Sequence, residues 1–382
     1  MPAFYTHYIF GKLGYQDLEE SMLKEMIRKH KKVYAFGLSG PDIFFYFAID
    51  QLLLKRTPGS RMHEEKCGIF LRRMLNEALA LSAKEREIGL AYLAGFIGHY
   101  ALDVSCHPHV YAYIEEEAAR ISRGEARRVG EACDYPLHKK LHKEDRRFFC
   151  GENGNESGKK IQNGQGLPEG KEAAGTPGTA RKRLRVRISR KPRAHRVSAH
   201  EKTGIHFRYE CAMDHYFLEH YISKNTGQLK QGKMVYLLPQ ERRIIARMVA
   251  SAYNKTYDRP NMSEASVRAV LFSVRMVQHL IRDPYGRKER VFSPIEKFVY
   301  HHPFFAGLFV NDNCYGIGWD EWAKMNLLFL EGRKEYGEML DALAKVVEAA
   351  LGLEGSQMAY GMALKEFVQV LGSRSYHTGE PV

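Results

Sequence analysis

Apolar side chains recur at helical spacing along most of this 382-residue chain. Residues 18–30 show the pattern first, with apolar side chains at positions that share one face of a helix. The same spacing is found in residues 69–81, 88–104, 205–222, 241–253, 263–281 and 319–351. No long run alternates apolar and polar residues with a period of two, which is the pattern of a half-buried strand. The sequence therefore predicts an all-α fold.

Residues 88–104 differ from the other predicted helices because they are apolar nearly all round. A helix without a polar face is normally buried on all sides. We therefore expect this helix at the centre of the fold. Hydrophobic residues make up 44% of the chain and charged residues 27%, which is the balance of a globular protein with a substantial core.

Residues 151–204 interrupt the helical pattern. The first thirty residues of this segment contain eight glycines, and nine Lys or Arg with no acid follow between Arg181 and Arg196. A segment this poor in bulky apolar residues cannot bury enough surface to offset its ordering entropy. We therefore expect a disordered basic insertion at 151–204 within a single helical domain formed by 1–150 and 205–382.

The basic segment also accounts for most of the net charge of +13. Three interpretations stay open: contact with an anionic membrane surface, contact with nucleic acid, or a merely solubilising loop. The first residues lack a basic region followed by an apolar run, and the stretch 33–54 contains a proline and two acids. We therefore expect a cytoplasmic protein without a membrane span, either free or peripheral to a membrane.

The most informative positions lie on and just beyond the central helix. His99, Asp103 and His107 are spaced by four and would share one helix face. Polar groups on a buried face are costly unless they are paired or bind a metal, and these side chains suit zinc. His99 and His107 would lie about 12 Å apart, too far to share one ion, but Asp103 between them could bridge two. The alternative is a set of hydrogen-bonded core side chains. Because Pro108 disfavours helix at the residue before it, we place His107 near the helix end.

Three further sets of polar residues are candidates for the same chemistry. His206, Glu210 and Asp214 are again spaced by four, although a solvated helix face would look the same. Asp42 stands between a glycine-rich turn and an apolar run, so it is either a site residue or a plain helix N-cap. His138 and His142 are also four apart, but the lysines around them favour a solvated face.

The order of these motifs resembles the zinc-dependent phospholipase C family, in particular its cytoplasmic bacterial branch. The resemblance covers roughly residues 1–220, apart from the insertion, and no motif after about residue 230 adds to it. The matching segments are Pro2-Ala3-Phe4-Tyr5-Thr6-His7, Gly40-Pro41-Asp42-Ile43-Phe44-Phe45-Tyr46, Gly98-His99-Tyr100-Ala101-Leu102-Asp103 with His107-Pro108, and His206-x3-Glu210-x3-Asp214.

The resemblance implies an all-helical metallohydrolase that holds two to three zinc ions and hydrolyses a phosphodiester such as a phospholipid. It implies a first zinc held by Asp42, His63, His99 and Asp103, a second held by His107, His206 and Glu210, and a third held by His7 and Asp103. His63 is placed only by its position between motifs. Asp42 would also accept a proton from the attacking water, and Asp214 would orient a ligand histidine. Secreted relatives add an N-terminal Trp to the third site, and this chain has none there.

Two other functions remain open at this stage. A three-zinc nuclease specific for single strands shares the fold and the ligand order, and it would need an aromatic slot for a base beside the metals. A metal-holding scaffold without catalytic activity would instead bind a membrane or a partner through its basic insertion.

Overall fold

The computed structural model describes residues 4–46, 57–123, 197–222, 237–258, 261–282, 317–352 and 357–382. Helices make up nearly all of this part of the chain, which contains no strand apart from an isolated bridge between Arg374 and Pro381. The all-α prediction is therefore confirmed. The helices are α1 (Phe4–Asp17), α2 (Met22–Lys29), α3 (Lys31–Gly37), the 3₁₀ helix η1 (Gly40–Tyr46), α5 (Pro58–Glu64), α6 (Cys67–Leu79), α7 (Ala83–Ser122), α9 (Ala199–Ile222), α10 (Pro239–Thr256), α11 (Glu264–Arg282), α15 (Trp319–Leu351) and α16 (Gln357–Leu371).

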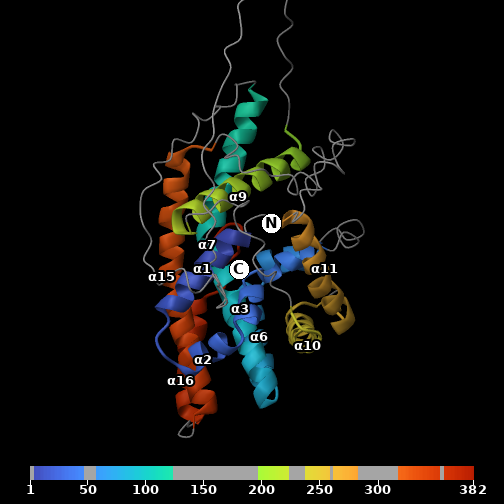
Figure 1. Cartoon of the computed structure of the whole chain (residues 1–382), viewed down its shortest axis with the longest axis vertical. Helices are drawn as coiled ribbons and strands as arrows, with labels where there is room; N and C mark the ends of the chain where they lie inside the picture. Colours follow the sequence, from blue (N-terminus) through green and yellow to red (C-terminus); the bar gives the residue numbers. More distant parts are fainter. Residues whose placement is uncertain are drawn as a thin grey trace, which may run out of the picture.

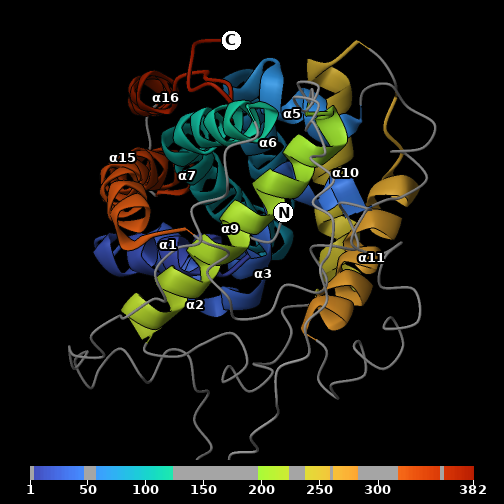
Figure 2. The ribbon, with the colours of Figure 1, turned by 90° about the horizontal axis from the view of Figure 1, so that it is seen from above.

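Helix α7 is the central element, as its apolar sequence predicts. It contacts α1, α2, α3, α6, α9, α10 and α15. Figure 1 shows α7 running along the long axis of the molecule, beside α15, while α9 crosses it at a steep angle. Seen from above, α10 and α11 lie on the opposite side of the molecule from α1 and α2 (Figure 2).

One prediction about α7 is wrong. Pro108 was expected to end the helix near His107, but α7 continues through the proline to Ser122. The proline lacks the N–H that would bond the carbonyl of Val104, a loss that costs about 3 kcal/mol in a helix interior. Tertiary packing offsets this cost, because Val110 and Ile114 beyond the proline are both buried in the core.

The contact between α3 and α7 is unusually close because two glycines face each other. A Cβ on Gly37 would lie 2.3 Å from the carbonyl oxygen of Tyr92, and one on Gly95 would lie 2.1 Å from that of Tyr34. Only glycine permits the two backbones to approach this closely. The contact fixes the end of α3, and therefore the turn that follows it, against the middle of α7.

Helix α9 starts earlier than the sequence pattern indicates. It begins at Ala199, so residues 199–204, which were assigned to the insertion, are helical. The apolar spacing that marks the helix begins only at Ile205, which is why the periodicity missed the first turns. Residues 151–196, with the basic run 181–196 and the predicted disorder, lie outside the described residues, as do His138 and His142.

No helix among the described segments is long and apolar enough to cross a membrane. The described part of residues 33–54 lies mainly in α3 and η1.

Replacing residues 151–196 with a short Gly/Ser linker should leave the fold intact. Helices α7 and α9 contact each other directly, so their packing does not need the segment between them. Loop-closure entropy varies slowly with length, so we expect the free energy of unfolding to change by about 1 kcal/mol or less. Denaturant unfolding followed by circular dichroism measures this change. A large loss of stability would show that the segment belongs to the folded domain.

Candidate metal centre

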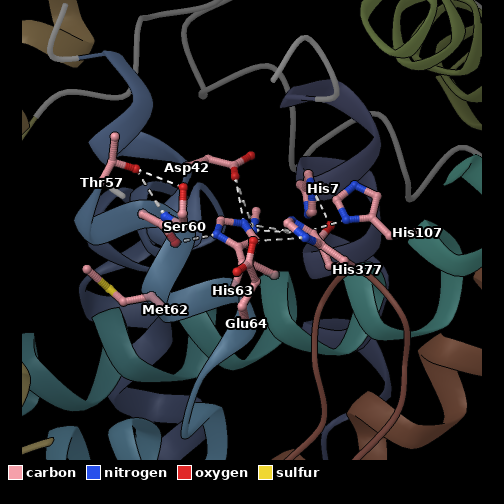
Figure 3. A network of polar contacts seen from close by, with 12 residues as sticks. His7, Asp42, Thr57, Ser60, Met62, His63, Glu64, His107 and His377 are labelled. Carbon is pink, nitrogen blue, oxygen red and sulfur yellow. Dashed lines mark hydrogen bonds and ion pairs between the residues drawn. The ribbon is translucent and has the colours of Figure 1, made fainter. Parts of the chain in front are cut away.

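The first of two clusters combines two carboxylates and two imidazoles from three elements. Asp42 comes from η1, His63 from α5, and His99 and Asp103 from α7; one potential ligand atom of each lies within 4.8 Å of the others. His63 Nε2 is 3.1 Å from Asp42 Oδ1, and His99 Nε2 is 3.0 Å from Asp103 Oδ2. Figure 3 shows Asp42 and His63 pointing toward each other.

Backbone carbonyls orient the two imidazoles of this cluster. His63 Nδ1 lies 2.7 Å from the carbonyl oxygen of Gly59, and His99 Nδ1 lies 3.1 Å from that of Leu38. A carbonyl can only accept, so Nδ1 carries the proton in both rings. In the neutral rings Nε2 therefore presents a lone pair to the carboxylate oxygens. A lone pair and a carboxylate repel each other unless a proton or a metal ion lies between them.

The turn before η1 places the Leu38 carbonyl on His99. Gly40 has a φ of 50°, and a Cβ at this position would lie 2.2 Å from the ring of His99. A side chain is therefore excluded twice, by the left-handed backbone and by the imidazole. The sequence signal for this turn is the glycine-rich stretch that precedes Asp42. Asp42 itself lies inside η1 and faces His63 and His99, so it is not the N-cap of an α-helix.

Helix α5 is short but well defined at its start. Thr57 Oγ1 accepts a hydrogen bond from the Ser60 N–H at 3.2 Å, and Pro58 occupies the first helical position. Both features favour helix initiation at this point. His63 lies in the last turn of α5 and its side chain is only 2% exposed. The capped helix thus projects a buried imidazole toward η1 and α7.

The second cluster joins α7 to α9. His107 Nε2 is 3.3 Å and His206 Nε2 is 3.0 Å from the same oxygen, Oε1 of Glu210. One potential ligand atom from each of the three residues lies within 4.8 Å of the other two. Burial alone would lower the pKa of His107, but the carboxylates of Asp103 and Glu210 raise that pKa to about 9. The cluster therefore binds a positive charge strongly, whether a proton or a metal ion.

Asp103 belongs to the first cluster and also contacts His107 of the second. Its Oδ2 is 3.4 Å from His107 Nδ1, and its Oδ1 is 3.3 Å from Nε2 of His7, which comes from α1. Burial would raise the pKa of Asp103, but His107, His99 and His7 hold it well below its usual value. A buried carboxylate that stays ionised among imidazoles is suited to bridge metal ions.

Comparison with known proteins agrees with this geometry. A family model described as zinc-dependent phospholipase C matches residues 6–262 of the chain. The chain belongs to the zinc-dependent phospholipase C family. No curated protein and no solved structure matches it.

The donors present fit the zinc of this phospholipase C family. Among the predicted zinc ligands, four buried atoms lack a hydrogen-bond partner of acceptable geometry within the described part of the chain; they are His7 Nδ1, His99 Nε2, Asp103 Oδ2 and His107 Nδ1. Buried polar atoms are rarely left unsatisfied, and atoms of this type at this spacing are the usual ligands of zinc. The two clusters fit two to three zinc ions.

Seven of the eight ligands predicted from the sequence lie in the two clusters. His7, the eighth, contacts Asp103 and stacks on His99, with ring centroids 4.2 Å apart, but it belongs to neither cluster. A third zinc at His7 and Asp103 therefore stays a prediction. Residues 1–3 lie outside the described residues.

Asp214 has a different role from the one predicted. Its carboxylate accepts hydrogen bonds from the Thr6 hydroxyl at 2.7 Å, the Thr6 N–H at 2.8 Å and the Tyr5 N–H at 3.3 Å. These donors are the first turn of α1, not a ligand histidine. Asp214 therefore holds the start of the helix that carries His7. Spacing placed it correctly on the inner face of α9 but could not reveal which element packs there.

Sequence reasoning missed one histidine beside the centre. His377 follows α16 and its ring stacks on His63, with centroids 5.4 Å apart. Burial, together with His63 and His107, lowers the pKa of His377 to about 3. His377 stands in a segment without helical spacing and far from every motif, so no pattern in the sequence singled it out.

Asp103→Asn should lower zinc content far more than Asp214→Asn. The first change removes negative charge from a position that touches both clusters. The second leaves every zinc donor in place and weakens only the anchoring of α1, so we expect a loss in metal affinity of about 10–100-fold at most. Elemental analysis of zinc per chain checks both. Equal zinc loss in the two variants would contradict the bridging position of Asp103.

Gly40→Ala should destabilise the protein and disturb the first cluster. The left-handed backbone costs about 1–2 kcal/mol for a non-glycine residue, and the contact with His99 adds about 1–3 kcal/mol of overpacking. Gly361→Ala is the matched control, because an added Cβ there meets nothing within 4 Å inside α16. It should instead stabilise by about 0.5–1 kcal/mol. Denaturant unfolding measures both; similar effects in both variants would contradict the close contact.

Proposed function

We propose that the chain is a zinc-dependent hydrolase that cleaves a phosphodiester, with phospholipid as the substrate class. The observation that carries this proposal is the pair of clusters joined by Asp103, within the region that the phospholipase C family model matches. Neighbouring cation sites suit a phosphodiester, whose oxygens can be held by both. A single structural zinc would need neither the second cluster nor the shared carboxylate.

When bound, zinc lowers the pKa of a coordinated water and neutralises the charge that develops on the phosphoryl oxygens and the leaving oxygen. The water oxygen joins phosphorus, the bond from phosphorus to the glycerol oxygen breaks, and a proton passes to that oxygen. The products are a diacylglycerol and a phosphorylated head group. The chain's own residues hold the ions and move the proton.

Asp42 is the residue we assign to the first proton transfer. Its side chain is 17% exposed, whereas those of His99 and Asp103 are 0% and 3% exposed. Burial raises the pKa of Asp42, but His99 and His63 more than compensate and lower it to about 2. Asp42 is therefore an ionised carboxylate at the accessible side of the first cluster, where it can accept a proton from water.

Aromatic rings beside the clusters favour one alternative substrate. The ring of Tyr111 lies 5.3 Å from that of His206 and 5.9 Å from that of His107, and Phe45 lies 5.2 Å from His63. Such rings could stack on a base, so a nuclease acting on single strands is the second candidate. The metal chemistry would be the same, and only the group attached to the phosphate would differ.

The zinc-loaded full chain should hydrolyse phosphatidylcholine, and chelation should abolish this activity until zinc is restored. A panel of phosphatidylcholine vesicles, a soluble aryl phosphodiester and single-stranded DNA identifies the substrate class. Preference for DNA would replace the phospholipase assignment with the nuclease. Absence of hydrolysis of all three by a chain with full zinc content would favour a non-catalytic metal-binding scaffold.

Asp42→Asn should lower kcat by about 10²–10⁴-fold, the usual contribution of general base catalysis. Zinc content must be measured in the same sample, because Asp42 also belongs to the first cluster. His30→Ala is the control, since His30 pairs with Glu87 at 3.4 Å, away from the metal centre. A variant that keeps both its zinc and its kcat would exclude Asp42 as the base.

A further inference from the structure

A hooked segment, residues 372–382, folds back against the metal centre after α16. The backbone N–H of Tyr376 donates to the carbonyl of His63 at 2.9 Å, and the N–H of Gly68 donates to Ser373 Oγ at 3.1 Å. The N–H of Arg374 donates to the Tyr100 hydroxyl at 3.0 Å. These bonds attach the hook to α5, α6 and α7.

The hook is also held together internally. The N–H of Ser375 donates to the carbonyl of Glu380 at 2.8 Å, and the N–H of Gly379 donates to the carbonyl of Ser375 at 2.9 Å. Tyr376 is fully buried, and a salt bridge of 2.5 Å joins Arg374 to Glu335 of α15. The conformation of the hook therefore does not depend on the side chain of His377.

His377 projects from the hook toward both clusters. Its ring stacks on that of His63 in the first cluster and lies 6.2 Å, centroid to centroid, from that of His107 in the second. Figure 3 shows the His377 side chain between those of His63 and His107. The side chain is 26% exposed, so it borders the centre without being enclosed by it.

His377 is not a member of either set of potential metal ligands. Its Nδ1 is 3.6 Å from Glu64 Oε1, beyond hydrogen-bond distance, so the ring is not committed to one partner there. The His377 imidazole lies beside His63 of the first cluster and His107 of the second, and it is partly exposed. It is therefore placed to contact a group that binds between the two clusters. For a phosphodiester hydrolase that group is the phosphoryl group.

We propose that His377 is a substrate-contacting residue, and that a ring N–H of its imidazole hydrogen-bonds the phosphoryl group held at the metal centre. The proposal rests on the proposed function in its choice of ligand. It adds a residue from outside the stretch that the family model matches, which ends at residue 262. The hook thus contributes directly to the active site rather than only covering it.

The test uses inorganic phosphate as the probe and the zinc-loaded full chain. Isothermal titration calorimetry should show phosphate binding weakened about 10–150-fold by His377→Ala, the loss of one hydrogen bond to a charged group. His377→Gln should recover part of the affinity, because its amide also donates. Thr378→Ala is the matched control on the same turn: it removes one hydrogen bond within the hook, from the Glu380 N–H to Thr378 Oγ1 at 3.3 Å, but no imidazole, and it should bind phosphate as the wild type does. Zinc content should be unchanged in all three.

Other outcomes would overturn the proposal. Equal phosphate affinity in wild type and His377→Ala, with zinc intact, would show that the imidazole does not meet the phosphoryl group. Zinc loss in both His377 variants would make His377 a metal-supporting residue instead. Tighter phosphate binding in His377→Ala would show that the hook obstructs the centre. Because phosphate binding is measured without turnover, a wild type that hydrolyses no diester would refute the proposed function separately.

Discussion

The buried carboxylate of Asp103 is the interaction on which the rest of the centre depends. Its side chain is 3% exposed and lies within 4 Å of nitrogens from His7, His63, His99 and His107. A buried ion is tolerated only when it is compensated, since its desolvation costs several kcal/mol. Helices α1, α5 and α7 therefore meet at this carboxylate, and α9 joins them through Glu210. Any cation bound there also fastens the helices to one another.

Much of the centre could be predicted because its ligands follow helical spacing. The spacing by four predicted that His99, Asp103 and His107 share one face of α7 and that His206 and Glu210 share one face of α9. The structure brings these side chains into the two clusters. The position of His63 was inferred only from its place between motifs, yet the structure brings it to Asp42. The agreement on α7 and α9 has one cause, since local periodicity fixes which side chains leave a helix on the same side, whereas His63 rested on the order of the motifs.

The predictions that failed, and the residue that was missed, depend on which elements pack together, and local periodicity does not show this. Local rules end a helix at Pro108, but core packing carries α7 past it. Spacing could not show that Asp214 meets the start of α1, over two hundred residues away in sequence. His377 comes from a hook whose position is set by backbone bonds to α5 and α6, so nothing near it in sequence marks it as a site residue.

The acids within the two clusters also determine the charge that a substrate meets. Asp42, Asp103 and Glu210 supply three negative charges, and all three have pKa values held below their usual range. Two divalent ions would leave the loaded centre with one net positive charge, which the single charge of a phosphodiester neutralises. Without ions or added protons, the same acids would repel that substrate. Metal loading would therefore set the charge that the proposed phosphodiester substrate meets, as well as supporting its hydrolysis.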